Sequence, residues 1–282
     1  MQKIAILTDS GSDVPAAVAK QLNITVLPLQ VNFKGGSYRD GVEISAQEVY
    51  DRLPVEIPTT SLPKGEDLQA IFDQFEKEGV THILAVTLSS GLSGTNNMIR
   101  LASEEAYCPM VVLDTKNIGI GSGMSVIAAA RWVAEGKSFD EVIDLTKKAI
   151  ENTKIYFVLS TLEYLQKGGR IGKVTALLGS TFDLKPIITC NDEGIYTTVT
   201  KARGRKQSLR KTVDLAKAWG NQAKIHVAVA HGSALDEANE IIEGFKASEL
   251  DVQEVYLGPV SPALGVHTGP GLICVCVQRI VE

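Results

Sequence analysis

The chain has 282 residues, of which 44% are hydrophobic and 22% charged, and its formal net charge is −5. This length allows one large or two ordinary globular domains, and the composition excludes a disordered chain. An acidic chain lacks the clustered basic charge on which general nucleic-acid binding depends, so no nucleic-acid partner is expected.

Strand and helix patterns alternate through the first half of the chain. Apolar runs closed by polar residues indicate buried parallel strands, and amphipathic stretches with capping residues indicate the helices between them. Ser45 and Ser138 each precede a Glu by three residues, which predicts two capping boxes. Pro28 favours an edge strand or a bulge in the second strand. The predicted strands are residues 3–9, 24–33, 81–88 and 110–115, and the predicted helices are residues 12–22, 45–53, 65–79, 95–106, 122–135 and 139–152.

The pattern changes near residue 155, where strands follow one another with fewer helices between them. Strands are predicted at residues 154–161, 185–190, 194–202, 224–232, 252–258 and 271–281, and helices at residues 208–220 and 234–248. We therefore predict an α/β protein of two closely packed domains. The N-terminal domain, residues 1–155, has a parallel sheet, and the C-terminal α+β domain, residues 156–282, has a mixed sheet.

The cysteines and the N-terminus bear on cellular location. Cys274 and Cys276 alternate within the last predicted strand, where small buried side chains are expected. The first residues lack the features of a signal peptide, and no apolar run approaches the ~18 residues of a membrane helix. The sequence also lacks a P-loop, an H-E-x-x-H motif and a cysteine cluster. A reduced, cytoplasmic protein with no metal site and no integral membrane segment is expected.

Polar residues collect where the predicted parallel strands end. Residues 9–12, 89–95 and 114–115 follow three of these strands, and ligands of open α/β sheets bind at that edge. Thr60 and Ser61 precede another helix. Hydroxyls and free N–H groups at helix starts favour anions, although simple capping uses the same residue types. Ser12 or Asp13 is expected to have such a capping role.

Ser93 leaves two further functions open. The run from Gly91 to Thr95 is similar to a nucleophile elbow, but Thr95 stands where the motif has its second glycine. A triad would need His231 or His267 as the base, with Asp236 between them in the chain. A serine hydrolase of acyl esters with Ser93 as the nucleophile is therefore one alternative. Binding of a small phosphate or sugar phosphate at the same helix starts is the other.

Residues 257–271 are rich in glycine and proline, which predicts a rigid loop in place of a regular element. This loop would present His267 and Thr268 to a ligand. Two compact basic stretches, at residues 170–173 and 201–207, are candidates for binding an anionic ligand or a protein partner.

Taken together, the motifs resemble the DegV family of fatty-acid-binding proteins. The resemblance extends from about residue 3 to residue 280 and implies two α/β domains with one fatty acid between them, its acyl chain buried and its carboxylate held by hydroxyls. By position in the motifs, the implied fatty-acid-binding residues are Thr60, Ser61, Ser93, Gly94, Thr95, His267 and Thr268. The motifs that carry the resemblance lie in family order at residues 8–15, 38–45, 58–67, 88–95, 162–172, 201–207, 230–232 and 258–271.

The same resemblance implies a carrier that is not itself an enzyme. Family members serve as acyl-carrier subunits of bacterial fatty acid kinase, so a partner kinase would phosphorylate the bound carboxylate with ATP for phospholipid synthesis. The bound fatty acid would be the ligand and no cofactor is implied, while any contact with a membrane surface would be transient. Arg170 and Arg203 match family arginines associated with docking onto the kinase. The chain departs from the family at Leu62–Pro63, where members often have Gln-Pro.

Overall fold

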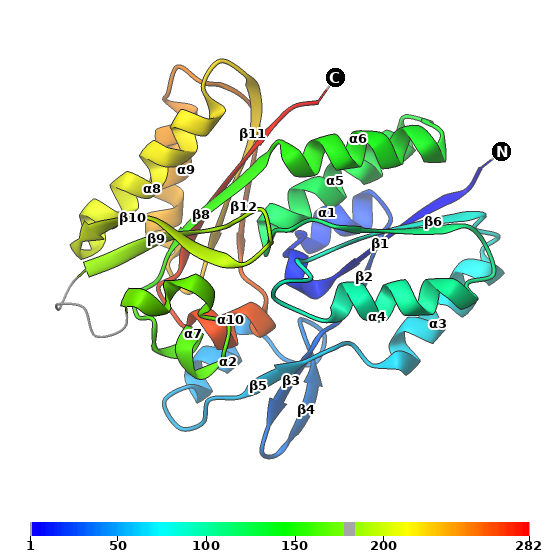
Figure 1. The fold of residues 1–282 in the computed structure, drawn as a ribbon, viewed down its shortest axis with the longest axis horizontal. Helices are drawn as coiled ribbons and strands as arrows, with labels where there is room; N and C mark the ends of the chain where they lie inside the picture. Colours follow the sequence, from blue (N-terminus) through cyan, green and yellow to red (C-terminus); the bar gives the residue numbers. More distant parts are fainter. Residues whose placement is uncertain (1, 178–183, 282) are drawn as a thin grey trace.

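The computed structural model describes residues 2–177 and 184–281, so residues 1 and 282, the outer limits of the two predicted domains, lie outside that part. Within it, the strands form a four-stranded sheet, a six-stranded sheet and a three-stranded sheet (Figure 1). The α/β class predicted from the alternating patterns is confirmed. The domain boundary near residue 155 stays a prediction.

The four-stranded sheet is wholly parallel, with the order β2-β1-β6-β7. Its strands are β1 (Ile4–Asp9), β2 (Ile24–Leu27), β6 (His82–Thr87) and β7 (Met110–Asp114). Side chains alternate along each strand, so Ile6 packs on one face while Leu7 packs on the other. Helices α1 (Ala16–Gln21), α5 (Ile120–Ala134) and α6 (Phe139–Glu151) cover the first face, and α3 (Gly65–Lys77) and α4 (Thr95–Ala102) cover the second.

Pro28 divides the strand predicted at residues 24–33. Its first part is β2, and its second part is β3 (Gln30–Phe33), which belongs to the separate three-stranded sheet. Proline lacks the N–H that a continuous strand would need at this position. The small sheet has the order β4-β3-β5 and is antiparallel, with β4 (Gly36–Arg39) and β5 (Thr59–Ser61) on either side of β3.

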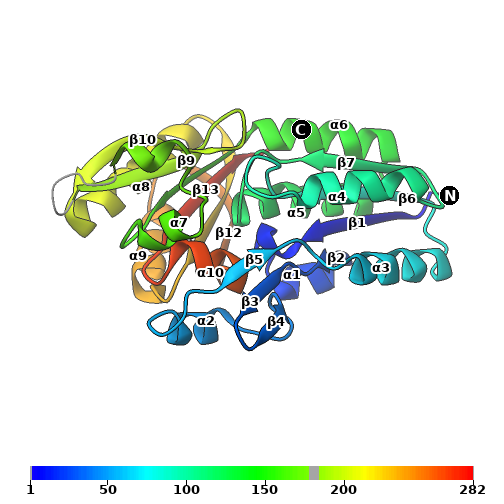
Figure 2. The ribbon, with the colours of Figure 1, turned by 60° about the horizontal axis from the view of Figure 1, so that its bottom comes forward.

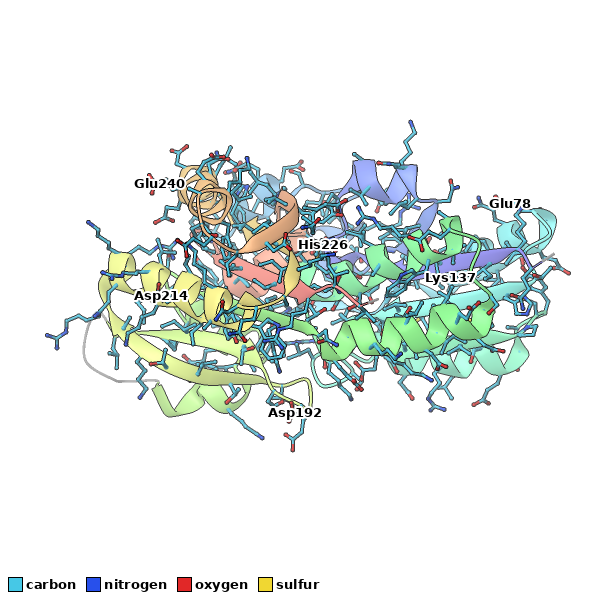
Figure 3. The ribbon with its side chains drawn as sticks, turned by 90° about the horizontal axis from the view of Figure 1, so that it is seen from above. Glu78, Lys137, Asp192, Asp214, His226 and Glu240 are labelled. Carbon is cyan, nitrogen blue, oxygen red and sulfur yellow. The ribbon has the colours of Figure 1, made fainter. Side chains whose placement is uncertain are left out.

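The six-stranded sheet is mixed, as predicted, because β11 and β12 are parallel whereas the other neighbours are antiparallel. Helices α8 (Gly204–Gly220) and α9 (Leu235–Lys246) cover one face around the buried Phe245. Asp214 and Glu240 lie on the outer sides of these helices, away from the sheet (Figure 3). The sheet has the order β10-β9-β8-β13-β11-β12, with strands β8 (Thr153–Val158), β9 (Leu184–Cys190), β10 (Tyr196–Arg203), β11 (Lys224–His231), β12 (Asp251–Pro259) and β13 (Ile273–Arg279).

The other face of this sheet packs against short elements that reach across from both halves of the chain. They include α2 (Ala46–Arg52), α7 (Glu163–Lys167) and α10 (Pro262–Thr268), which lie together beside β3 and β5 (Figure 2). The 3₁₀ turns are η1 (Ser10–Ser12), η2 (Ser103–Glu105) and η3 (Gly172–Leu177). This arrangement brings the start of the chain next to its last helix.

The prediction of an irregular loop at residues 257–271 was wrong, since α10 occupies its centre. Ser261 accepts a hydrogen bond from the Leu264 N–H as the N-cap, and Pro262 stands in the first turn. Proline is favourable at that position because its missing N–H is one that the helix leaves unpaired. The glycines and prolines therefore mark the ends of a short helix.

The residues that cap the observed helices agree only in part with those predicted from the sequence. Both predicted capping boxes are confirmed, at Ser45 with Glu48 and at Ser138 with Glu141. Neither Ser12 nor Asp13 caps the start of α1, because Pro15 is its N-cap, and Asp13 adopts a left-handed conformation as the C-cap of η1. Across residues 2–177 and 184–281, no helix combines the length and apolar character that crossing a membrane would need.

Candidate ligand-binding site

A cavity of about 220 Å³ lies between the carboxyl edge of the parallel sheet and the inner face of the mixed sheet. Residues that follow β1, β6 and β7 form one wall, and side chains of β8, β10, β11 and β13 form another. β5 and α10 complete the enclosure. The lining is mainly apolar and includes Ile118, Ile120, Ile155, Phe157, Val260 and Leu272. Such a lining suits an elongated apolar ligand.

The cavity opens to solvent between β5 and the start of α4. Ser61, Leu62 and Gly94 line the cavity and are exposed, whereas Ile155 and Phe157 are buried deep inside. A Cβ atom at Gly94 would lie 3.4 Å from Cδ2 of Leu62, so the Leu62 side chain borders the opening.

Thr60 and His267 meet beside this opening. Oγ1 of Thr60 and Nε2 of His267 are 2.7 Å apart and hydrogen bonded. Thr60 is held in β5 opposite Val31 of β3, and His267 lies in the last turn of α10. The sequence predicted both as ligand-binding residues, and the structure brings them together in the cavity wall.

His267 is neutral at pH 7. Burial, and then the nearby Arg170 guanidinium, lower the pKa of its imidazole to about 4. The second ring nitrogen, Nδ1, has no hydrogen bond partner among the described residues. It packs against the backbone of Gly168, where an added Cβ atom would be 2.1 Å away. A glycine at position 168 is what leaves space for the ring.

Ser93 and Thr95 occupy different positions relative to the cavity. Ser93 lines the cavity, and its Oγ lies 2.9 Å from Oγ1 of Thr95 and accepts a hydrogen bond from the Thr95 N–H. Thr95 is fully buried and does not line the cavity, so it holds Ser93 from behind. Gly94 lies between them as the N-cap of α4 and reaches the opening.

Ser61 and Thr268 also lie in the cavity wall, with hydroxyls that are already engaged. Ser61 is exposed, and its Oγ accepts a hydrogen bond from Nδ2 of Asn32 at 3.1 Å. The Thr268 hydroxyl donates to the Leu264 carbonyl within α10, at 2.9 Å. The Thr268 hydroxyl is therefore used within α10, whereas Ser61 lies at the exposed rim of the cavity.

The two arginines predicted to dock a partner are far from equivalent. Arg170 is half-buried in the cavity wall, where its Nη1 donates to the Gly168 carbonyl at 2.8 Å. Arg203 is exposed at the start of α8 and is not part of the wall. The sequence left open whether this basic turn binds an anionic ligand or a protein partner, and Arg170 lies in the cavity wall. Docking through either arginine stays a prediction.

A cluster of three acidic side chains beside the cavity, of which Asp13 lines it, was also missed. Burial is the main reason why the pKa values of Asp9, Asp13 and Asp40 rise, to about 7, about 8 and about 6. Backbone N–H groups donate to all three, from Leu88, Ser261 and Ala263 respectively, at 2.9, 2.8 and 2.8 Å. Asp13 and Asp40 thereby tie the start of α10 to the first half of the chain. The available signal was the polar end of the first strand.

The arrangement does not resemble a serine hydrolase. A catalytic serine needs a base within hydrogen-bond reach, and a third group that orients this base. Nε2 of His267 bonds to Thr60, and its Nδ1 has no orienting carboxylate among the described residues. Nδ1 of His231 accepts the Ala234 N–H at 3.4 Å, and His231 is not in the cavity wall. Ser93 is therefore placed to donate and not to attack.

Metal and thiol chemistry find no support at this site. Within residues 2–177 and 184–281, no group of three or more His, Cys, Asp or Glu side chains could hold a metal ion. Cys274 and Cys276 are free and buried, as predicted, and burial raises the pKa of both thiols. These thiols remain protonated at neutral pH and act as small core side chains.

The fold and the cavity define an α/β ligand-binding protein, and comparison with known proteins gives the family. A model described as "Uncharacterised protein, DegV family" matches residues 3–279, and the chain belongs to this family. A DegV domain-containing protein of Clostridium acetobutylicum is 40% identical over 280 residues, covering 99% of this chain and 100% of that protein.

Two solved structures share the whole fold. A DegV family protein from Thermus thermophilus, solved to describe its fatty acid binding, is 31% identical and has a TM-score of 0.93, with 99% of this chain and 100% of that chain covered. A stearic acid-binding protein from Eubacterium ventriosum is 28% identical, with a TM-score of 0.86 and coverages of 99% and 98%.

Proposed function

We propose that the protein binds one long-chain fatty acid, with the acyl chain inside the cavity and the carboxylate beside Thr60, Ser93 and His267. The observation that carries the proposal is an enclosed, mainly apolar cavity whose hydroxyl and imidazole groups lie next to its opening. Each buried CH₂ group contributes roughly 0.8 kcal/mol, so a long chain contributes on the order of 10 kcal/mol before ordering costs. The fatty acid binding described for the Thermus thermophilus relative supports the same ligand class.

The polar groups suit a carboxylate because they are donors. A neutral His267 with its proton on Nε2 donates to Oγ1 of Thr60, which leaves the Thr60 hydroxyl free to donate to the ligand. Ser93 accepts from the Thr95 N–H, and when the Thr95 hydroxyl also donates to it, its own proton is free as well. Hydrogen bonds to an ionised acceptor are about twice as strong as neutral ones. Arg170 adds positive charge in the same wall.

We further propose that the bound acid is presented to a fatty acid kinase subunit. A carboxylate oxygen would attack the γ-phosphorus of ATP, the bond to the β-phosphate oxygen would break, and ADP would leave. The exposure of Ser61, Leu62 and Gly94 at the opening supports access by a second protein. Arg203 and Arg170 are proposed to contact that protein. The chain itself supplies no catalytic group in this scheme, and the acyl phosphate would feed phospholipid synthesis.

The alternative of a small phosphate ligand is less well supported, since a small anion would leave the apolar depth of the cavity empty.

Identification of the bound ligand distinguishes the fatty acid proposal from the phosphate alternative. Solvent extraction or native mass spectrometry of the purified protein should find one long-chain fatty acid per chain, and the delipidated protein should be stabilised by added fatty acid and not by inorganic phosphate. A protein that neither carries nor takes up any fatty acid would overturn the proposal.

The kinase step has its own test. The loaded protein, a bacterial fatty acid kinase catalytic subunit and Mg-ATP should yield an acyl phosphate that hydroxylamine traps as the hydroxamate. Replacing both Thr60 and Ser93 by alanine should abolish the hydroxamate and weaken fatty acid retention only modestly. Unchanged transfer in this double variant would contradict the role assigned to the two hydroxyls.

A further inference from the structure

Asp13 places a carboxyl group in the wall of the apolar cavity. The residue ends η1 in a left-handed conformation with φ 50° and ψ 31°, and its N–H donates to the Ser10 carbonyl. Residues other than glycine, asparagine and aspartate rarely adopt this backbone conformation. The backbone therefore fixes the direction in which the Asp13 side chain leaves the main chain.

The N–H and the hydroxyl of Ser261 both lie close enough to this carboxyl group to lower its pKa, but among the described residues only the N–H meets the geometry of a hydrogen bond. Oδ1 accepts a hydrogen bond from the Ser261 N–H at 2.8 Å, whereas Oδ2 is buried and has no partner among the described residues. Oδ2 lies beside Gly119 and Leu264, which also line the cavity. A Cβ atom at Gly119 would lie 3.0 Å from Oδ2, so the absence of a side chain at Gly119 leaves room for this buried oxygen next to the cavity lining.

The protonation state of Asp13 decides what Oδ2 needs. Burial, followed by the charges of Asp40 and Asp9, raises the pKa of Asp13 to about 8. The group is therefore mainly neutral at pH 7, with its proton on Oδ2 because Oδ1 already accepts from the backbone. A buried O–H without an acceptor is unfavourable, and methylene groups of a plain acyl chain offer none.

We propose that Asp13 recognises a hydroxyl group on the acyl chain, so that the preferred ligand is a hydroxy fatty acid. This proposal rests on the proposed function, because a carboxylate held at Thr60 and Ser93 fixes which carbon passes Asp13. A hydroxyl oxygen accepts from the neutral carboxyl group, and a hydroxyl proton donates to the ionised one. A keto group matches the neutral form alone, and a saturated chain matches neither.

The test is a competition on the delipidated full chain. Octadecanoic acid competes with a series of hydroxyoctadecanoic acids whose hydroxyl occupies successive carbons along the middle of the chain, and native mass spectrometry reads the bound fraction of each. One isomer, or two adjacent isomers, should bind about tenfold more tightly than octadecanoic acid, as expected for one buried hydrogen bond. An equal affinity for all isomers and the plain acid overturns the proposal, and a water trapped beside Asp13 would give that result.

Two substitutions assign the preference to Asp13. Asp13→Asn keeps an acceptor for the Ser261 N–H and a donor for the ligand, so the preference should persist. Asp13→Gly tolerates the same backbone conformation but removes the carboxyl group, so the preference should disappear whatever happens to the absolute affinity, because each isomer is compared with octadecanoic acid in the same variant. A preference that survives in Asp13→Gly overturns the proposal, and the wild-type isomer profile decides the question even if a variant does not fold. Failure of every fatty acid to bind would count against the proposed function itself.

Discussion

Thr60 Oγ1 and His267 Nε2 form a 2.7 Å hydrogen bond between residues that are 207 positions apart in the chain. One partner lies on a three-residue strand of the small sheet and the other at the end of a seven-residue helix. Neither element is long enough to be stable alone, so tertiary packing positions the pair. The structure of the site therefore depends on contacts between the first half of the chain and its last helix.

The first prediction concerns this hydrogen bond. Thr60→Val keeps the shape of the side chain but removes the hydroxyl, which leaves Nε2 of His267 without its partner and the carboxylate with one donor fewer. We expect the affinity for a long-chain fatty acid to fall by about threefold, within the modest loss expected when both hydroxyls are removed, as measured by displacement of a fluorescent fatty acid. Thr59→Val, one residue away in β5 and outside the cavity wall, is the matched control and should change the affinity little. Equal losses in both variants would argue against a special role for Thr60.

The second prediction uses the space beside His267. Gly168 has ordinary helical φ and ψ values of −76° and −5°, so alanine is compatible with its backbone. The new methyl group would lie 2.1 Å from Nδ1 of His267 and must displace the ring. Gly168→Ala should therefore weaken fatty acid retention without unfolding the protein.

Gly244→Ala in α9 is the matched control for this change, because no atom lies within 4 Å of the added methyl group. Alanine stabilises a helix interior by about 1 kcal/mol relative to glycine. The control should raise the melting temperature and leave binding unchanged. If Gly168→Ala binds like the wild type, His267 does not contribute to ligand retention in its observed position.

The third prediction is a dependence of stability on pH. The pKa values of Asp9 and Asp13 rise from 3.8 to about 7 and about 8 on folding, so the native state binds more protons than the unfolded state between these limits. Stability must then fall as the pH rises, by about 1.4 kcal/mol per pH unit for each extra bound proton. His267 acts in the opposite direction below pH 6.5, because its pKa is lowered to about 4 on folding.

Urea unfolding at pH 6.5 and pH 8.5 therefore brackets the pKa values of both aspartates. The wild type should be less stable at the higher pH, and Asp9→Asn should reduce that difference because its amide cannot ionise. Asp214→Asn, at an exposed position on α8, should leave the difference unchanged. A wild type that gains stability over this range would show that the carboxyl groups are ionised in the folded protein.

The fourth prediction separates the two arginines. Arg170 lines the cavity and its charge lowers the pKa of His267, whereas Arg203 lies outside the wall. Arg170→Met should weaken fatty acid binding and raise the pKa of His267, which an NMR titration of the imidazole would detect. Arg203→Met should affect neither property. If both variants bind fatty acid normally and both fail to support the kinase, the two arginines share a docking role.

The sequence predicted helices and strands well where the apolar residues repeat regularly or where a helix-capping motif is present. The buried parallel strands, both capping boxes and the mixed sheet follow from local patterns, and so does the collection of Ser93 and Gly94 at a strand end. Pro28 and Pro262 were harder to interpret, because proline marks a break in one context and a helix start in the other.

The finer placement of site residues depended on tertiary contacts that no local pattern encodes. Thr95 and Ser93 are two positions apart in one motif, yet one is buried behind the wall and the other is in it. Arg170 resembles a surface charge in sequence, and Asp13 resembles a helix cap. In each case, burial by a distant segment gives the side chain its environment, and a sequence window does not contain that segment.

The hydrogen bonds from Ser261 and Ala263, at the start of α10, to Asp13 and Asp40 have a consequence for exchange kinetics. They join the two halves of the chain beside the cavity and so oppose separation of its walls. On the proposed function, a bound acyl chain would then slide lengthwise past Leu62, headgroup first on leaving and methyl end first on entering. We expect residence time to grow with the length of the chain that must slide, even among acids of equal equilibrium affinity.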